Sequence, residues 1–404
     1  VSSLGKGITS ASLGALLKAR NFTVVNQKFD PYINVDPDTM NPFQHGEVFV
    51  TEDGATTDLD LGHYERFTDV DLKKESNVTT GSVYRAVIDK ERKGDYLGAT
   101  VQVIPHITDE IKKRIKSVSG NNDVQITEIG GTVGDIEILP FLEAARLMRK
   151  EYGKENVAFI HVTLVPYIGP SSELKSKPTQ HSVAQLRSYG ISPDLIVLRS
   201  NQPISEDIRN KVSLYCDVSS SNVISAEDLD DIYEVPLRMH NEGLDASVIQ
   251  LLNLQENDID LSEWNKINEI QKTINKKIKI GMLGKYNGLP DSYLSVVEAL
   301  RHACFHNHVS LDIKWLDSDN FDPEEFKGLD GVVVPGGFGY RGIEGKLNGI
   351  TYLRENNIPF LGLCLGLQCA VIEYARNVCN ITDANSSEFA PNTKNPVIDL
   401  LPNQ

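Results

Sequence analysis

Short apolar runs rich in valine and isoleucine alternate along the chain with segments of helical periodicity. The runs that we expect to form strands are residues 23–29, 124–129, 157–165, 195–198, 279–283, 331–334 and 360–363. They are apolar at odd and even positions alike, which is typical of parallel strands buried on both faces. Segments such as 8–20 and 140–152 carry apolar residues at helical spacing. The alternation predicts an α/β fold with doubly wound, mostly parallel sheets.

A polar, acidic stretch at residues 255–260 interrupts this alternation. Residues 261–274 have the pattern of a short amphipathic helix, and a new strand follows them. We therefore predict a first domain at residues 1–255, a linker at 256–276 and a second domain at 277–404.

The charge balance restricts the possible partners. Among 404 residues, 40 Lys and Arg face 56 Asp and Glu, and the net charge is −16. A protein that binds nucleic acid or a membrane surface usually carries a basic face, so neither partner is expected. A local lysine cluster or a helix N-terminus can still hold the phosphates of a nucleotide.

The cysteines and the chain ends suggest a cellular setting. Five cysteines, an odd number without a CxxC spacing, argue against a disulfide framework or a zinc site and favour the reducing cytoplasm. No apolar run approaches the roughly 18 residues that span a membrane. The sequence opens at Val1 without a signal peptide, and we expect it to be truncated at both ends.

A glycine-rich turn at residues 2–8, with the sequence SSLGKGI, leads into the first predicted helix. Free N–H groups, the positive helix end and the Lys6 ammonium together suit the β- and γ-phosphates of a nucleotide. Gly7 stands where a P-loop has the Ser or Thr that binds the metal. On its own the motif fits an ordinary glycine-rich helix start equally well.

Acidic residues downstream favour the phosphate interpretation. Residues 57–60 are expected to be extended, so that Asp58 and Asp60 share one face. Glu128 comes at the end of the run 124–129, and the carboxyl ends of parallel strands form the crevice in which α/β proteins bind ligands. Carboxylates beside a triphosphate imply Mg²⁺.

A third cluster, KSKPTQ at residues 175–180, precedes a predicted helix at 181–189. Two lysines beside a helix N-terminus suit a second anion, and Lys211 is a candidate to join them. A solvated basic loop explains the same spacing.

The sequence FLGLCLGLQ at residues 360–368 gives the sharpest signal. A strand enters Gly-x-Cys-x-Gly and a helix leaves it, as in a nucleophile elbow with Cys364 in place of serine. The helix N-terminus would lower the thiol pKa, and the glycine-rich segment 335–339 could complete an oxyanion hole with the N–H of Leu365. A buried, inert thiol is the alternative, and we assign it to the other four cysteines.

With both halves in view, the chain resembles the CTP synthase family. The matching segments are residues 2–8, 28–36, 44–50, 58–67, 94–107, 128–137, 175–183, 335–342 and 362–368. The resemblance implies an amidoligase domain joined to a class I glutamine amidotransferase domain. In that family ATP phosphorylates the 4-oxygen of UTP, and ammonia from glutamine displaces the phosphate to give CTP.

The resemblance also implies roles for individual residues. Lys6 and Cys364 would be catalytic, and Asp60 and Glu128 would bind Mg²⁺. The ATP site would consist of Ser3, Leu4, Gly5, Lys6, Gly7, Ile8, Lys28, Asp60, Glu227, Asp228 and Leu229. The shared site of UTP and the inhibitor CTP would consist of Ser2, Asp135, Ile136, Glu137, Lys175, Ser176, Lys177, Pro178, Thr179, Gln180 and Lys211. Glutamine would contact Gly337, Leu365, Gly366, Leu367, Gln368 and Glu388. The ammonia passage would include Pro42, His45 and Val48. The family further implies GTP as activator, a homotetramer and possible filaments.

One departure from the family pattern leaves alternatives open. All nine histidines precede Cys364, and no residue matches the His–Glu pair that class I amidotransferases place after the nucleophile. A paralogue that binds nucleotides or forms filaments without glutaminase activity is therefore an alternative. Another is a related fusion that amidates cobyrinate carboxylates, although segments 44–50 and 175–180 argue against it.

Overall fold

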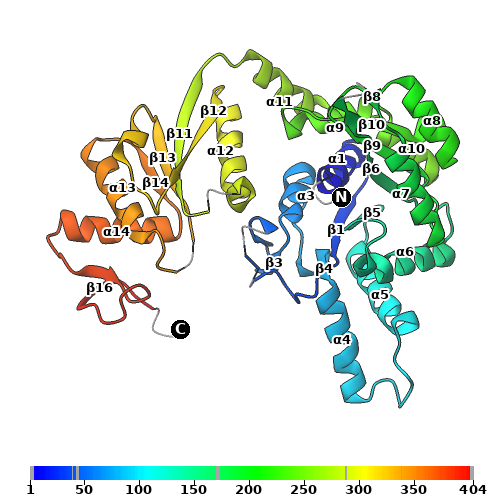
Figure 1. The fold of residues 1–404 in the computed structure, drawn as a ribbon, viewed down its shortest axis with the longest axis horizontal. Coiled ribbons are helices and arrows are strands. Elements are labelled where there is room, and N and C mark those ends of the chain that lie inside the picture. Colours follow the sequence, from blue (N-terminus) through cyan, green and yellow to red (C-terminus); the bar gives the residue numbers. More distant parts are fainter. Residues whose placement is uncertain are drawn as a thin grey trace. The chain divides into compact units, whose positions relative to one another are not determined.

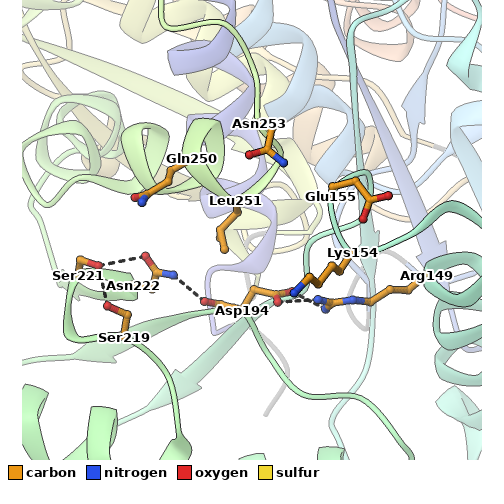
Figure 2. A pocket seen from close by; sticks show the side chains of 10 residues that line it. All are labelled: Arg149, Lys154, Glu155, Asp194, Ser219, Ser221, Asn222, Gln250, Leu251 and Asn253. Carbon is orange, nitrogen blue, oxygen red and sulfur yellow. Dashed lines mark hydrogen bonds and ion pairs between the residues drawn. The ribbon is translucent and has the colours of Figure 1, made fainter.

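The structure is a computed structural model that describes residues 4–38, 40–41, 45–169, 173–286, 289–337 and 339–400. It divides into two compact units (Figure 1). The first comprises Val1–Thr39 and Val48–Asn268, and the second Met40–Glu47 and Glu269–Gln404. Packing alone defines these units, so the assignment of separate activities to residues 1–255 and 277–404 stays a prediction. None of the helices in the described ranges combines the length and apolar character needed to cross a membrane.

The first unit contains two three-stranded parallel sheets. One has the order β4 (Asn77–Thr79), β1 (Val24–Asp30) and β5 (Val124–Ile129). The other has the order β10 (Val223–Glu227), β9 (Leu195–Ser200) and β6 (Ile160–Leu164). Two small antiparallel pairs accompany them: β2 (Phe49–Val50) with β3 (Thr56–Thr57), and β7 (Tyr167–Ile168) with β8 (Glu173–Leu174).

Helices cover both faces of these sheets. They are α1 (Lys6–Ala19), α3 (Asp60–Thr68), α4 (Thr80–Lys93), α5 (Thr108–Ser119), α6 (Leu139–Tyr152), α7 (Lys177–Ser188), α8 (Glu206–Cys216), α9 (Val235–Asn241) and α10 (Leu244–Leu251). Leu195 and Val197 of β9 pack in one cluster with α1, α9 and α10, whereas Ile196 and Leu198 pack with α7 and α8. Alternate residues of one strand therefore enter two apolar cores, which confirms the predicted doubly wound α/β arrangement.

The second unit has one parallel sheet in the order β12 (Ser310–Asp317), β11 (Lys277–Gly284), β13 (Gly331–Val334) and β14 (Phe360–Gly362). Helices α13 (Ile343–Glu355) and α14 (Leu365–Asn377) share an apolar core with β11, β12 and β13. Figure 1 shows α12 (Leu294–His306) on the other face of the sheet. A short parallel pair, β15 (Ala384–Ser386) and β16 (Asn395–Ile398), follows α14.

The short amphipathic helix predicted at residues 261–274 is confirmed as α11 (Ser262–Thr273), which crosses the division between the units at residue 268. Two details differ from the predicted elements. Strand β6 is shorter than the apolar run 157–165. Helix α7 begins at Lys177, four residues before the predicted start, so the cluster at 177–180 forms its first turn.

Candidate active sites

The glycine-rich turn forms the start of α1, as predicted. Gly5 is the N-cap, with the left-handed backbone angle φ of 85° that glycine adopts readily. Lys6 follows as the first helical residue, and its Nζ donates to the carbonyl of Gly131 at 3.2 Å. The loop after β5 thus lies beside the loop that begins α1.

Gly7 is explained by the approach of Asp60. A Cβ atom placed on Gly7 would lie 2.1 Å from Oδ1 of Asp60, far inside contact distance. The carboxylate therefore occupies the position that a Ser or Thr side chain would need. This accounts physically for the departure from the usual P-loop.

Lys28 lies at the centre of the site. Its Nζ pairs with Oδ2 of Asp60, lies 2.9 Å from Oε1 of Glu128 and lies 3.9 Å from Oδ1 of Asp30. Burial opposes the charge of Lys28, but Asp60 and Glu128 outweigh it and hold its pKa well above the ordinary value. The hydroxyl of Tyr64, which is fully buried, donates to the other oxygen of Glu128.

The surrounding carboxylates carry an excess of negative charge. Burial and the neighbouring Asp58 raise the pKa of Asp30 well above its usual range, and burial raises the pKa of Glu128. Burial acts in the same direction on Asp60, yet Lys28 holds the pKa of this carboxyl below its ordinary value. The groups gathered here are the carboxylates of Asp30, Asp58, Asp60 and Glu128 and the ammonium groups of Lys6 and Lys28.

This donor set fits a divalent cation, because four hard carboxylates face two lysines. The described residues contain no preformed group of three His, Cys, Asp or Glu side chains placed to hold a metal. Asp60 and Glu128 are instead separated by Lys28, which pairs with both. A cation that binds between them would have to displace this ammonium.

The prediction that residues 57–60 are extended was wrong beyond Thr57, which ends strand β3. Leu59 has helical backbone angles, Asp60 begins α3, and its N–H donates to Oδ1 of Asp58 at 2.9 Å. Asp58 therefore satisfies a free N–H of the helix start, which the alternation of a strand does not anticipate. Both carboxylates still act electrostatically on Asp30.

The segment at Glu227–Leu229 comes close to the α1 loop through Arg199, a residue that sequence analysis missed. Arg199 donates to the carbonyl of Ala226 at 2.9 Å and to Oδ1 of Asp228 at 2.6 Å. A Cβ atom placed on Gly5 would lie 3.4 Å from its Nε. The sequence feature that could have identified Arg199 is its position, as a charged residue at the carboxyl end of the buried strand β9.

The residues of the predicted UTP site lie on neighbouring elements. Ile138, which ends the turn after Asp135, packs with Leu186 of α7, and Ile136 is exposed. The Nζ of Lys177 lies 5.5 Å from the ring centre of Tyr215 on α8, the helix that carries Lys211.

The two other lysines of this set have acidic neighbours. Lys175 pairs with Glu173, and Lys211 lies 2.6 Å from Asp207 on its own helix. Each of these two lysines is paired with a carboxylate of its own segment, so their common role stays a prediction.

In the second unit, Cys364 has the geometry of a nucleophile elbow. It precedes α14 with backbone angles φ 49° and ψ −109°, and it is exposed. A Cβ atom on Gly366 would lie 1.8 Å from the carbonyl oxygen of Val334, and one on Gly362 would lie 2.6 Å from the carbonyl carbon of Gly366. Both glycines are therefore required by close main-chain approach.

Two donors lie beside this thiol. A Cβ atom on Gly336 would lie 3.5 Å from Cβ of Cys364. Within the described part of the chain, the N–H groups of Gly336 and Leu365 donate to no acceptor. Free, fixed N–H groups next to a thiol have the chemistry of an oxyanion hole.

The other predicted glutamine contacts and the predicted ammonia passage are less complete. Glu388 follows β15, its N–H donates to Oγ of Ser386 at 3.2 Å, and no hydrogen bond of the described residues ties its carboxylate to Cys364. His45 is exposed and Val48 is half-buried, and the N–H of Glu47 donates to the carbonyl of Asp291 at 2.9 Å. Ser2, Ser3 and Pro42 lie outside the described residues.

Comparison with known proteins covers both units. Residues 1–254 match the family profile described as CTP synthase N-terminus, and residues 288–398 match that of glutamine amidotransferase class-I. The CTP synthase of Carboxydothermus hydrogenoformans is 62% identical over 410 residues, which cover 100% of this chain and 77% of that protein. The CTP synthase of Caldanaerobacter subterraneus subsp. tengcongensis is 60% identical, with coverage of 100% and 76%. The solved glutaminase domain of Trypanosoma brucei CTPS with bound acivicin is 38% identical over 31% of this chain and 50% of that one, with a TM-score of 0.30.

Proposed function

The chain belongs to the CTP synthase family, whose reaction is the glutamine-dependent amination of UTP to CTP, and from this premise we propose how its residues divide that reaction. The first unit activates and aminates UTP, and the second unit releases ammonia from glutamine. Residues 1–255 carry the synthetase activity and residues 277–404 belong to the amidotransferase domain.

ATP binds at the start of α1. Leu4–Ile8 supply main-chain N–H groups, Lys6 and Lys28 supply positive charge, and Glu227–Leu229 lie near the adenine. Asp60 and Glu128 would hold Mg²⁺, which would supply positive charge to the triphosphate. Lys28 is the counter-ion of the same carboxylates and would supply positive charge to the phosphates.

UTP binds along the first turn of α7 and the turn at residues 135–137. The γ-phosphate of ATP passes to the 4-oxygen of the uracil ring, which makes that oxygen a leaving group. Ammonia then attacks the ring carbon, and phosphate departs as the C–O bond breaks. CTP, the product, shares the triphosphate site and inhibits there.

Glutamine is hydrolysed at Cys364. The thiol attacks the side-chain amide of glutamine. The substrate is contacted by Gly337, by residues 365–368 and by Glu388. Ammonia moves through a passage that includes Pro42, His45 and Val48. We further propose GTP as activator, a homotetramer that can form filaments, and a cytoplasmic location.

The observation that carries the synthetase assignment is the gathering of Lys6, Lys28, Asp60 and Glu128 at the carboxyl ends of β1 and β5. We would measure CTP formation from UTP, ATP and Mg²⁺ with either ammonium chloride or glutamine. Lys6→Ala should abolish both reactions, because the transferred phosphoryl group loses a fixed cation. Cys364→Ala should abolish only the glutamine reaction. Substantial ligation by the Lys6 variant would remove Lys6 from the phosphate site.

A further inference from the structure

Lys346 is a fully buried lysine in the second unit that no sequence motif singled out. It lies on α13 between core residues such as Ile343 and Leu347, and its exposed fraction is 0%. Its Nζ donates to the main-chain carbonyl of Pro335 at 2.8 Å. Among the described residues no carboxylate lies within ion-pair distance of this ammonium.

Such a position is costly for a charged group. Burial lowers the pKa of Lys346 to about 8; Cys369 and Cys364 act in the opposite direction, and the like charge of Lys285 lowers the pKa further. An apolar side chain would fill the same space without this cost. The hydrogen bond to Pro335 is therefore the feature that distinguishes Lys346 from an ordinary core residue.

The bonded carbonyl belongs to the peptide between Pro335 and Gly336, and Gly336 lies next to the nucleophile. The bond between Pro335 and Gly336 is trans, so its C=O and its N–H point to opposite sides. The C=O of this peptide accepts the hydrogen bond from Lys346. Its N–H belongs to Gly336, and a Cβ atom placed on Gly336 would lie 4.0 Å from Sγ of Cys364. This N–H donates to no acceptor among the described residues.

We propose that Lys346 is a positioning residue for glutamine hydrolysis, which fixes the peptide of Pro335 and Gly336 so that its N–H is aimed at the developing oxyanion. The ammonium also polarises the peptide and strengthens its N–H as a donor. This inference rests on the proposed role of Cys364 as the nucleophile.

The step that it serves is the attack on the amide. Sγ of Cys364, as thiolate, forms a bond to the side-chain carbonyl carbon of glutamine, and the π pair of the C=O moves to the oxygen. When that pair returns, the C–N bond breaks and the nitrogen takes a proton and leaves as ammonia. Water then cleaves the thioester to glutamate and restores the thiol. The oxyanion exists only during attack and collapse, so its donors affect kcat more than KM.

The experiment compares three substitutions in the full-length protein. Lys346→Met removes the donor and keeps the chain length, and Lys346→Gln keeps a neutral donor. Lys314→Met is the matched control, because the Nζ of Lys314 donates to the carbonyl of Glu325 at 2.7 Å elsewhere in the same unit. Each protein is assayed for glutamine hydrolysis, for ammonia-dependent CTP formation, and for alkylation of Cys364 by iodoacetamide, which forms no oxyanion.

We expect Lys346→Met to lower kcat for glutamine about 10- to 100-fold, with KM within about 2-fold, since loss of one oxyanion donor costs about 100- to 1,000-fold. Lys346→Gln should recover part of that loss. Alkylation and ammonia-dependent synthesis should stay within about 2-fold, and the control should match the wild type.

Other outcomes would overturn the inference. An unchanged kcat would show that the peptide needs no anchor, and an equal loss in alkylation would show that Lys346 acts on the thiol itself. If the Met variant does not fold, Lys346→Leu, which also removes the donor to Pro335, takes its place, and an unchanged kcat in that variant refutes the proposal. The proposed function fails separately, if Cys364→Ala still uses glutamine.

Discussion

Lys28 gives the sharpest test of the proposed nucleotide site, because its role as counter-ion can be measured without any substrate. In Lys28→Met, Asp60 and Glu128 lose the ammonium that lies between them. Removing one partner from a buried ion pair costs about 3–5 kcal/mol. At about 2–4 °C per kcal/mol for a unit of this size, the unfolding temperature of the first unit should fall by about 10 °C.

The chain offers a clean reporter for this measurement. Of its two tryptophans, Trp264 packs on Phe67 of α3 in the first unit, with ring centres 5.4 Å apart. Trp315 lies in the second unit, so a Trp315→Phe background isolates the fluorescence of Trp264. The matched control is Lys90→Met, because Lys90 pairs with Glu110 but its side chain is 35% exposed, against 7% for Lys28. Glu110 keeps Arg114 as a second partner at 3.1 Å, so removing Lys90 leaves no carboxylate unpaired and should cost less than removing Lys28.

Magnesium and pH refine the test. Mg²⁺ should raise the unfolding temperature of Lys28→Met more than that of the wild type, because the cation no longer has to displace an ammonium. Burial already raises the pKa of Glu128, so protonation stabilises this carboxyl in the folded state. That stabilisation is present at low pH and is lost as the pH rises. The difference in unfolding temperature between the wild type and Lys28→Met should therefore become smaller as the pH is lowered from 8 to 5. A deficit no larger than that of Lys90→Met, or equal Mg²⁺ effects, would refute this account of the site.

Three further substitutions test separate contacts. Tyr64→Phe leaves one oxygen of Glu128 without its donor, so a Mg²⁺ titration of ATP-dependent CTP formation should show a higher half-saturating concentration; an unchanged midpoint would make Tyr64 purely structural. Lys177→Ala should weaken UTP and CTP in parallel by about 10- to 100-fold, as expected for loss of a charged hydrogen bond, and calorimetric titration would expose any divergence between the two ligands. Because burial lowers the pKa of Lys346 to about 8, the unfolded chain binds more protons between about pH 8 and pH 10.5, and stability rises with pH there. Urea unfolding followed by Trp315, the tryptophan of the second unit, in a Trp264→Phe background should therefore show the wild type gaining about 2–3 kcal/mol of stability relative to Lys346→Met from pH 7 to pH 10. A difference that does not change with pH would show that the pKa of this ammonium is not lowered by burial.

Sequence periodicity predicted the strands that are buried on both faces, and it did so for a physical reason. All four residues of β13 are buried and the strand lies between β11 and β14, so the apolar run and the strand have the same limits. Strand β12 was missed because its residues do not form an apolar run. Its sequence SLDIKWLD alternates apolar and polar residues, which is the pattern of a half-buried strand.

The charged residues inside the fold were the hardest to assign. Lys28, Arg199 and Lys346 lie in a strand, at a strand end and in a helix, where a pattern of apolar positions treats a charge as exposed. Each has a partner that is distant in sequence. Lys28 pairs with Glu128, 100 residues away; Arg199 pairs with Asp228, 29 residues away; and Lys346 donates to Pro335, 11 residues away. No local rule connects such positions, so the family resemblance identified Lys28, and the other two emerged only from the three-dimensional contacts.

Two of the glycines in the candidate sites have a common cause that their motifs do not express. Gly7 and Gly366 each lie in the first turn of a helix, and neither has a positive φ. Each is needed because an oxygen approaches the helix start: a side-chain oxygen of Asp60 at Gly7, and the main-chain oxygen of Val334 at Gly366. The difference between these oxygens matters, because a side chain can rotate away from an added methyl group and a buried strand cannot. Gly366 is therefore fixed by the architecture of the sheet, whereas Gly7 is fixed by the position that Asp60 must hold beside Lys28.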